Sequence, residues 1–284
     1  MNILSLFDGI SCGRVALERA GIEVDNYYAS ELDEHAIKIS RRNYPDIKQI
    51  GNVLNVDATK LGEIDLLIAG SPCQGFSFAG KQLAFEDPRS KLFFEFIRIM
   101  KECKPKYFLL ENVKMKQEFV DIITEQVGVA PLLINSNLVS AQNRQRYYWT
   151  NIPNVGFPYD PKAEELLLMD ILEEEEDVHE KYWASEKMRE NYDGGKYLNS
   201  KYTSQGNRIH DIESKSPTIC AGSHGYANGY IHINEVRKLT PTECERLQTL
   251  PDGYTDQVIS DTQRYKALGN GWTVDVIAHI LRQI

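Results

Sequence analysis

The chain has 284 residues, of which 42% are apolar, 26% charged and 10% aromatic. This composition is typical of a globular protein, and the length suits one large α/β domain or one large domain with a small one. It excludes disorder, collagen-like repeats and coiled coil as the main character of the chain. No apolar run approaches the ~20 residues that a membrane-spanning helix needs. The first twelve residues contain no lysine or arginine, so we expect no signal peptide.

The formal net charge of −9, taken alone, argues against a nucleic-acid partner. The charge is unevenly distributed, however. Residues 164–180 contain nine acidic side chains and no basic one, whereas residues 187–238 contain eight basic and five acidic side chains. Because an acidic protein with a locally basic surface can still bind a polyanion, the bulk charge does not decide the class of partner.

The five cysteines, at positions 12, 73, 103, 220 and 244, are widely spaced and form no C-x-x-C pattern. Such usage suits a reducing cytosol and argues against a disulfide framework. The six histidines show no ligand spacing with cysteine partners. We therefore expect no metal site.

The first half of the chain alternates strand patterns with helix patterns. Gly21 is a natural residue to end a helix, and Ser90 is placed to cap another. Strands separated by helices of about ten residues predict a mostly parallel sheet with ligands at the carboxyl ends of its strands. The expected strands are residues 2–7, 24–30, 65–70 and 107–110, and the expected helices are residues 14–21, 34–43 and 92–100.

The character of the chain changes after Pro153. Residues 159–192 are acidic and are expected to be helical, and residues 194–232 are rich in Gly, Ser, Asn and Tyr with short strand-like pieces. Thr240 and Glu243 form a capping box for a helix through Leu250. The expected division is a catalytic and cofactor-binding domain (1–153), a smaller target-recognition domain (154–236) and a C-terminal segment (237–284) whose last helix, 272–281, returns to the main sheet.

Several polar residues follow expected strands and could carry chemistry. A glycine loop after the first strand, with Glu31 after the second, is the general arrangement for a nucleoside-containing cofactor, although many such loops are only tight turns. Cys73 follows a buried strand within Ser-Pro-Cys-Gln, where a merely structural cysteine is less expected. Glu111 could be a simple helix cap, and Arg144 with Arg146 could be a solvated pair on one face of an extended segment.

Taken together and in order, these motifs resemble the motif series of DNA (cytosine-5)-methyltransferases. The resemblance spans nearly the whole chain, and residues 159–200 are covered least. Some stretches resemble the animal de novo enzymes and others the compact bacterial restriction-modification enzymes. The motifs are Phe7-Asp8-Gly9, Pro72-Cys73-Gln74, Glu111-Asn112-Val113, Gln142-x-Arg144-x-Arg146, Arg237-Lys238-Leu239-Thr240-Pro241-x-Glu243-Cys244 and Gly269-Asn270-Gly271.

The resemblance implies a Rossmann-like α/β methyltransferase fold that uses S-adenosyl-L-methionine, with a small, irregular target-recognition domain. Cys73 would be the nucleophile that adds to cytosine C6, Glu111 would hold N3 and the amino group, and Arg146 would bind the O2 edge. Arg144 would support the loop or bind a phosphate. The implied cofactor residues are Phe7, Asp8, Gly9, Gly13, Glu31, Leu32, Asn52, Val53, Pro72, Leu92, Asn270 and Trp272, and the implied DNA-binding residues are Gln74, Ser77, Gln205, Arg208 and Thr218.

The chain departs from the family pattern at three of these positions. Asn52 stands where the family usually has Asp, but it keeps an acceptor oxygen for the adenine amino group. Leu32 stands where many bacterial members have an aromatic residue that packs on adenine, and Trp272 could supply that aromatic ring instead. Gly271 replaces a common serine, which does not affect the backbone role of the turn.

The expected partner is double-stranded DNA, without a membrane or a metal, in the cytoplasm of a bacterial or phage-infected cell. We expect a monomer or weak self-association. Three alternatives stay open at this point: a tRNA cytosine-5 methyltransferase, a catalytically inactive DNA-binding homologue, and a nicotinamide or flavin oxidoreductase on a similar sheet. The spacing of the loop glycines argues against the last.

Overall fold

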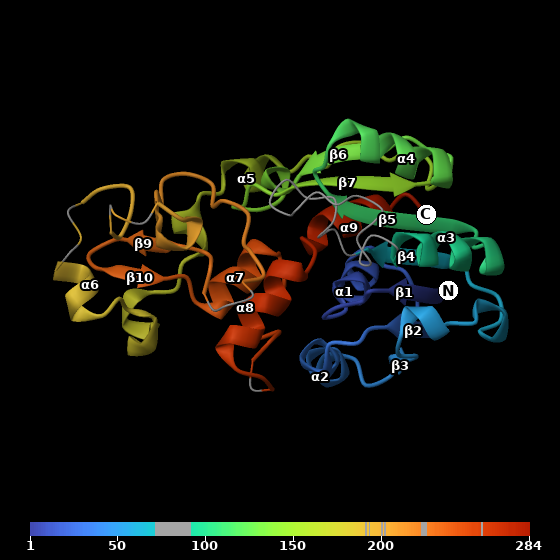
Figure 1. The fold of residues 1–284 in the computed structure, drawn as a ribbon, viewed down its shortest axis with the longest axis horizontal. Helices are drawn as coiled ribbons and strands as arrows, with labels where there is room; N and C mark the ends of the chain where they lie inside the picture. The colour runs from blue at the N-terminus through green and yellow to red at the C-terminus, as the bar shows by residue number, and fades with distance from the viewer. Residues whose placement is uncertain are drawn as a thin grey trace. The chain divides into compact units, whose positions relative to one another are not determined.

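The computed structural model describes residues 1–71, 92–190, 192, 194–199, 201, 203–222, 226–256 and 258–284. The chain divides into two compact units (Figure 1). Unit 1 contains residues 1–135, 145–157 and 274–284, and unit 2 contains residues 136–144 and 158–273. The chain therefore returns to unit 1 at Val274, and residues 237–273 belong to unit 2.

Unit 1 is built on a seven-stranded sheet in the order β3-β2-β1-β4-β5-β7-β6. The strands from β3 to β5 are parallel, and β7 is antiparallel to both β5 and β6. This arrangement confirms the predicted α/β class and the mostly parallel sheet. The strands are β1 (Asn2–Leu6), β2 (Asn26–Ser30), β3 (Lys48–Gln49), β4 (Leu66–Gly70), β5 (Tyr107–Val113), β6 (Leu132–Asn135) and β7 (Gln145–Thr150).

The register brings the carboxyl ends of the parallel strands to one edge of the sheet. Leu6 at the end of β1 pairs with Ser30 of β2 on one side and with Ala69 of β4 on the other. Gly70, the last residue of β4, pairs with Glu111 of β5. The carboxyl ends of β1, β2 and β4 thus lie at the same edge of the sheet, and the end of β4 lies beside Glu111.

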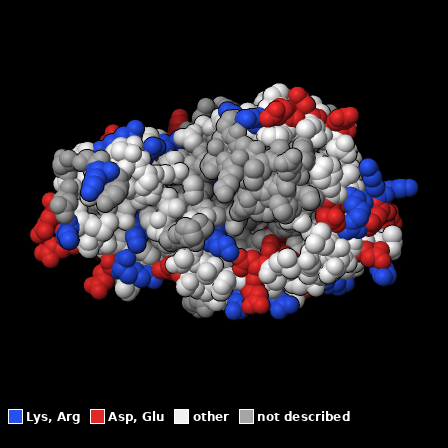
Figure 2. All heavy atoms as spheres, in the orientation of Figure 1, with Lys and Arg blue, Asp and Glu red and all other residues white. Residues whose placement is uncertain are grey.

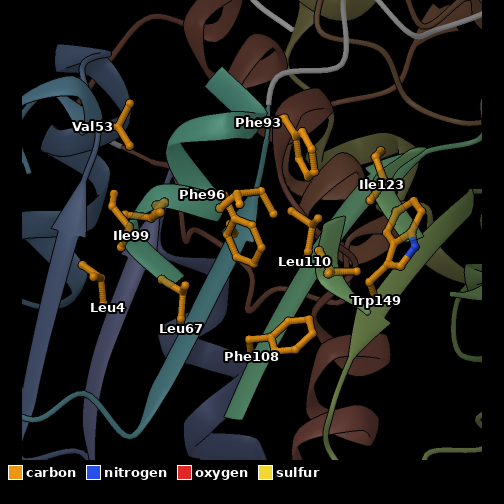
Figure 3. Packing of buried hydrophobic residues seen from close by; sticks show 14 of the residues in the cluster. Leu4, Val53, Leu67, Phe93, Phe96, Ile99, Phe108, Leu110, Ile123 and Trp149 are labelled. Carbon is orange, nitrogen blue, oxygen red and sulfur yellow. The ribbon is translucent and has the colours of Figure 1, made fainter. Parts of the chain in front are cut away.

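Helices of unit 1 cover the sheet because their apolar faces are buried against it. Figure 3 shows side chains of one core cluster, in which Phe93 and Phe96 of α3 pack with Leu67, Leu110 and Trp149 of the strands. Helices α1 and α9 contact each other. The helices are α1 (Cys12–Arg19), α2 (Glu34–Asn43), α3 (Leu92–Cys103), α4 (Gln117–Val127) and α9 (Val274–Leu281), with 3₁₀ turns η1 (Val53–Asn55) and η2 (Ala58–Lys60).

Unit 2 has a three-stranded sheet in the order β10-β9-β8 and short helices. Its interior contains a fully buried ion pair between Arg237 and Glu243, at 2.7 Å. Thr240 and Glu243 make the predicted capping box of α7. The elements are α5 (Pro161–Glu165), α6 (Glu186–Glu190), α7 (Pro241–Leu247), α8 (Asp261–Asn270), β8 (Ile209–His210), β9 (Tyr230–His232) and β10 (Val236–Lys238), with 3₁₀ turns η4 (Ser136–Leu138), η5 (Leu168–Ile171), η6 (Glu175–Asp177), η7 (Glu180–Tyr182) and η8 (Gln205–Asn207).

Several predicted boundaries were wrong, for identifiable reasons. Strand β5 continues through Val113 because β7 pairs with its last residues, so Glu111 lies within a strand. Helix α1 begins at Cys12 instead of Arg14. The acidic segment 159–192 forms no continuous helix but two five-residue helices and separate 3₁₀ turns, because neighbouring glutamates repel one another along a helix.

Candidate functional site

The loop after β1 is held in shape by the carboxylate of Glu31. The N–H of Gly9 donates to Glu31 Oε2 at 2.8 Å, and the N–H groups of Leu32 and Asp33 donate to Oε1 at 2.6 and 2.8 Å. Phe7 and Gly9 both have positive φ, 56° and 60°. For Phe7 this left-handed conformation is unfavourable, and such strain concentrates at functional sites. The loop after β1 and the end of β2 therefore form one preorganised structure.

Asp8 belongs to this loop, and its carboxylate lies in a polar cluster. Ser11 Oγ donates to its Oδ2 at 2.5 Å, and Tyr27 Oη donates to its Oδ1 at 2.7 Å. Desolvation raises the pKa of Asp8 from 3.8 to about 6, and the negative charge of Glu31 adds to the rise, while the hydroxyl hydrogen bonds oppose it. Asp8 is thus the group of the loop whose protonation changes near neutral pH.

Asn52 opens the turn that follows β3. Its Oδ1 accepts from the N–H of Leu54 at 3.0 Å and so caps the 3₁₀ turn η1. Val53 is 5% exposed and belongs to the core cluster, so its side chain is committed to packing. In contrast, Leu32 is 63% exposed and Leu54 is 58% exposed. Leu32 directly follows Glu31, and Leu54 lies two residues after Asn52. Leu32 is one of the predicted cofactor residues, whereas Leu54 is not.

The exit from β4 is tied to β5 by a buried hydrogen bond. Asn112 is 1% exposed and its Nδ2 donates to Ser71 Oγ at 3.0 Å. Ser71 directly precedes Pro72 in the sequence. The predicted residues Pro72, Cys73, Gln74 and Ser77 lie outside the described residues.

Glu111 and Arg146 form an ion pair between neighbouring strands. Arg146 Nε lies 3.0 Å from Glu111 Oε1, and the two side chains are only 14% and 10% exposed. The pairing of Glu111 with Tyr148 and of Val113 with Arg146 makes the pair a diagonal one across β5 and β7. The carboxyl group and the guanidinium present hydrogen-bond acceptors and donors side by side, and Glu111 itself pairs with Gly70 at the end of β4.

Arg144 does not share this environment, although the sequence analysis grouped it with Arg146. It precedes β7, belongs to unit 2 and is 3% exposed. Its guanidinium donates to the carbonyl oxygens of Ile219, Gly269 and Gly271 at 3.3, 3.1 and 2.8 Å. These hydrogen bonds fit the predicted support of a loop, and both roles of Arg144 stay predictions.

Arg144 holds the segment that contains Thr218, a predicted DNA-binding residue, through the carbonyl of Ile219, and this segment contacts Gln205 of η8. Gln205 is exposed, and its Nε2 donates to the carbonyl of Thr218 at 3.3 Å and lies 3.3 Å from the sulfur of Cys220. A Cβ added to Gly269 would lie 2.2 Å from the backbone nitrogen of Ala221, so only glycine permits α8 to approach this segment so closely. Thr218 and Gln205 are therefore neighbours.

Arg208 lies in the same part of unit 2, directly after η8. Its guanidinium carbon is 6.0 Å from the centre of the Tyr197 ring, and its Nε is buried without a hydrogen-bond partner among the described residues. On the described part of the face in Figure 2, lysine and arginine side chains form scattered groups and no continuous patch. The contact of Arg208 with DNA remains a prediction.

The remaining predicted cofactor residues occupy both units. Gly13 is buried in α1, and Leu92 begins α3 and is partly buried against the core. In unit 2, Asn270 ends α8 and is exposed, whereas Trp272 is 9% exposed. Their contact with a cofactor remains a prediction.

Among the described residues, no group of three or more His, Cys, Asp or Glu side chains is arranged to hold a metal ion. None of the helices that the structure describes has the length and apolar character required to cross a bilayer.

Comparison with known proteins gives a family match along the entire chain. The model of the C-5 cytosine-specific DNA methylase family matches residues 1–284. The type II methyltransferase M.NlaX of Neisseria lactamica is 32% identical over 302 residues, covering 100% of this chain and 96% of that protein. The type II methyltransferase M.HhaI of Haemophilus parahaemolyticus is 29% identical over 320 residues, covering 100% of this chain and 94% of that protein.

Solved structures resemble the fold. A putative DNA modification methyltransferase encoded within a prophage of E. coli superposes with a TM-score of 0.77 at 21% identity, covering 100% of this chain and 98% of that one. The Entamoeba histolytica methyltransferase EhMeth superposes with a TM-score of 0.80 at 18% identity, covering 100% and 97%. The predicted methyltransferase fold is thereby confirmed.

Proposed function

Because the chain belongs to the C-5 cytosine-specific DNA methylase family, we propose that it transfers a methyl group from S-adenosyl-L-methionine to C5 of cytosine in double-stranded DNA. The observation that carries this proposal is the Glu111–Arg146 ion pair at the carboxyl edge of the sheet. Glu111 is opposite Gly70, and Cys73 is the third residue after Gly70 in the sequence. A nucleophile and a pair of base-binding groups are thus expected at one edge.

The residues at the ends of β1, β2 and β3 fit the cofactor. The Glu31 carboxylate is fixed by three N–H groups and can accept from ribose hydroxyls. Exposed Leu32 and Leu54 offer apolar surface for an adenine ring, and Asn52 offers an amide oxygen for its amino group. When bound, S-adenosyl-L-methionine supplies an electrophilic methyl group.

The chain's own residues would make C5 reactive. Cytosine C5 is a poor nucleophile, so the Cys73 thiolate first adds to C6 and forms a C–S bond. Glu111, in its protonated form, donates its proton to N3 and lets the ring accept the electron pair, and the proton returns to Glu111 when the C–S bond breaks. Arg146 binds the O2 edge and orients the Glu111 carboxyl. After C5 has been methylated, a base removes the C5 proton, and elimination breaks the C–S bond and regenerates Cys73.

Unit 2 would select the DNA target. C6 and C5 are inaccessible in a stacked duplex, so the target cytosine must leave the helix. Gln205 would fill the space that the base leaves, Arg208 would contact a guanine edge, and Thr218 would brace the backbone. Support for this assignment comes from the contact between Gln205 and Thr218 and from the hydrogen bond of Arg144 to Ile219, the residue after Thr218.

Bisulfite sequencing of a plasmid recovered from cells that express the chain tests the proposal. We expect methylated cytosines within one short sequence motif, and no methylation with Cys73→Ser. Absence of methylation with the unsubstituted, folded chain would contradict the proposal and would favour an inactive DNA-binding homologue. Competition between duplex DNA and tRNA for methyl transfer in vitro distinguishes a DNA methyltransferase from a tRNA methyltransferase. The tRNA enzyme is the weaker alternative because the matching family is described as DNA-directed.

A further inference from the structure

Arg98 on α3 connects that helix to the turn that begins at Asn52. Its Nη2 donates to the carbonyl oxygen of Val53 at 3.2 Å, and its Nη1 donates to the carbonyl oxygen of Val56 at 3.0 Å. Both carbonyls belong to the backbone that directly follows Asn52. Figure 3 shows Val53 and Ile99 of α3 as members of the same core cluster, so the two elements also pack together.

The guanidinium of Arg98 is itself held in place by two carboxylates of its own helix. Its Nε donates to Glu95 Oε2 at 2.8 Å, and its Nη1 donates to Glu102 Oε1 at 2.7 Å. The other oxygen of Glu102 accepts from the N–H of Ala58 at 3.4 Å. Ion pairs at these spacings stabilise a helix only slightly, and helix stability alone does not require contacts with two carbonyls of another segment.

Asn52 is the residue of this turn whose orientation matters chemically. An ionised aspartate, which the family usually has here, presents only acceptors, whereas an amide presents an oxygen acceptor and an NH₂ donor. Only the oxygen can accept from the N–H of Leu54, so the cap hydrogen bond fixes which way the Asn52 amide faces. If the turn moved, the amide could rotate and offer its donor instead.

We propose that Arg98 is a positioning residue for adenine recognition, which keeps the Asn52 oxygen as the acceptor for the amino group of the cofactor. The inference rests on the proposed function, since it assigns Asn52 to S-adenosyl-L-methionine. Arg98 itself does not touch the cofactor. It holds the carbonyl oxygens of Val53 and Val56, and the same turn holds the Asn52 amide through the N–H of Leu54.

Two ligands that differ only at the adenine amino group test this role. S-adenosylhomocysteine carries the amino group as a donor, and S-inosylhomocysteine carries an oxo group, which an amide oxygen repels. We expect the unsubstituted chain to prefer the adenosine form in calorimetry. Arg98→Ala and Arg98→Lys should each reduce the ratio of the two affinities about tenfold. The lysine variant keeps the charge for Glu95 and Glu102 but lacks the fork that reaches two carbonyls.

Arg19→Ala is the matched control. The side chains of Arg19 and Arg98 are similarly exposed, at 30% and 34%, and Arg19 also forms an ion pair within unit 1, with Asp275. It should leave the ratio unchanged. Asn52→Ala should abolish the preference. The inference is overturned if both Arg98 variants keep the full ratio, or if the unsubstituted chain binds both ligands equally. Binding of neither ligand by the unsubstituted chain would refute the proposed function, and the inference with it.

Discussion

Replacing Asp8 with Asn should change how the stability of the chain depends on pH. In the folded chain the pKa of Asp8 is raised from 3.8 to about 6, chiefly by desolvation. The folded state therefore holds this proton more tightly than the unfolded state. Below about pH 4 both states are protonated, and above about pH 6 both are ionised. Between these values stability is lost as the pH rises.

The size of the effect follows from the two pKa values. A rise from 3.8 to about 6 corresponds to about 3 kcal/mol of differential interaction. Asp8 is only partly buried, so we expect about 2–3 kcal/mol of stability to be lost across this range. An asparagine can still accept from Tyr27, and the Ser11 hydroxyl can rotate to accept from its amide. Asp8→Asn should therefore remove the penalty without removing the cluster.

Urea unfolding of both forms between pH 4 and pH 7.5 measures the effect. The free energy of unfolding of Asp8→Asn, relative to the unsubstituted chain, should increase by about 2–3 kcal/mol from the acid to the neutral end. Asp121→Asn on α4, where the aspartate is exposed, controls for the loss of one negative charge. A difference between Asp8→Asn and the unsubstituted chain that is constant with pH would refute the reasoning.

Four further substitutions test the candidate site and unit 2. Glu31→Ala should weaken S-adenosyl-L-methionine binding about 10- to 150-fold, because a charged acceptor is lost, and unchanged affinity in calorimetry would contradict the placement of the ribose. Gly269→Ala should destabilise the chain by about 1–3 kcal/mol, since its Cβ would meet the Ala221 nitrogen at 2.2 Å, and an unchanged urea midpoint would contradict this packing. Arg208→Ala should cost about 1–3 kcal/mol and relax selectivity at one base pair, whereas Lys201→Ala should weaken methylation evenly across sequences. Methylome sequencing distinguishes these two, and an unchanged motif in Arg208→Ala would mean that this residue does not read bases.

The sequence predicted the parallel core of unit 1 well because its signals are local. Apolar runs ended by polar residues marked β1, β2 and β4, and helix α2 has the predicted limits, Glu34–Asn43. The capping box at Thr240 was likewise readable from four consecutive residues. Such features depend on neighbours in the chain, which the sequence displays directly.

Features that depend on distant partners were not predicted. Arg144 and Arg146 are two residues apart, yet one donates to three carbonyls of unit 2 and the other pairs with Glu111 of unit 1. The extension of β5 through Glu111 arises from β7, which follows more than thirty residues later. The contacts of Arg98 likewise join residues more than forty positions apart. No periodicity or local spacing contains this information.

The most direct test of the proposed chemistry is the capture of its covalent intermediate. DNA made by amplification with 5-fluorocytosine in place of cytosine contains every candidate target, and fluorine at C5 cannot be eliminated as the proton is. Incubation with the chain and S-adenosyl-L-methionine, followed by peptide mass spectrometry, should find DNA attached to Cys73, with no adduct in Cys73→Ser. An adduct on another residue, or methyl transfer to ordinary DNA by Cys73→Ser, would contradict the assignment of Cys73 as the nucleophile.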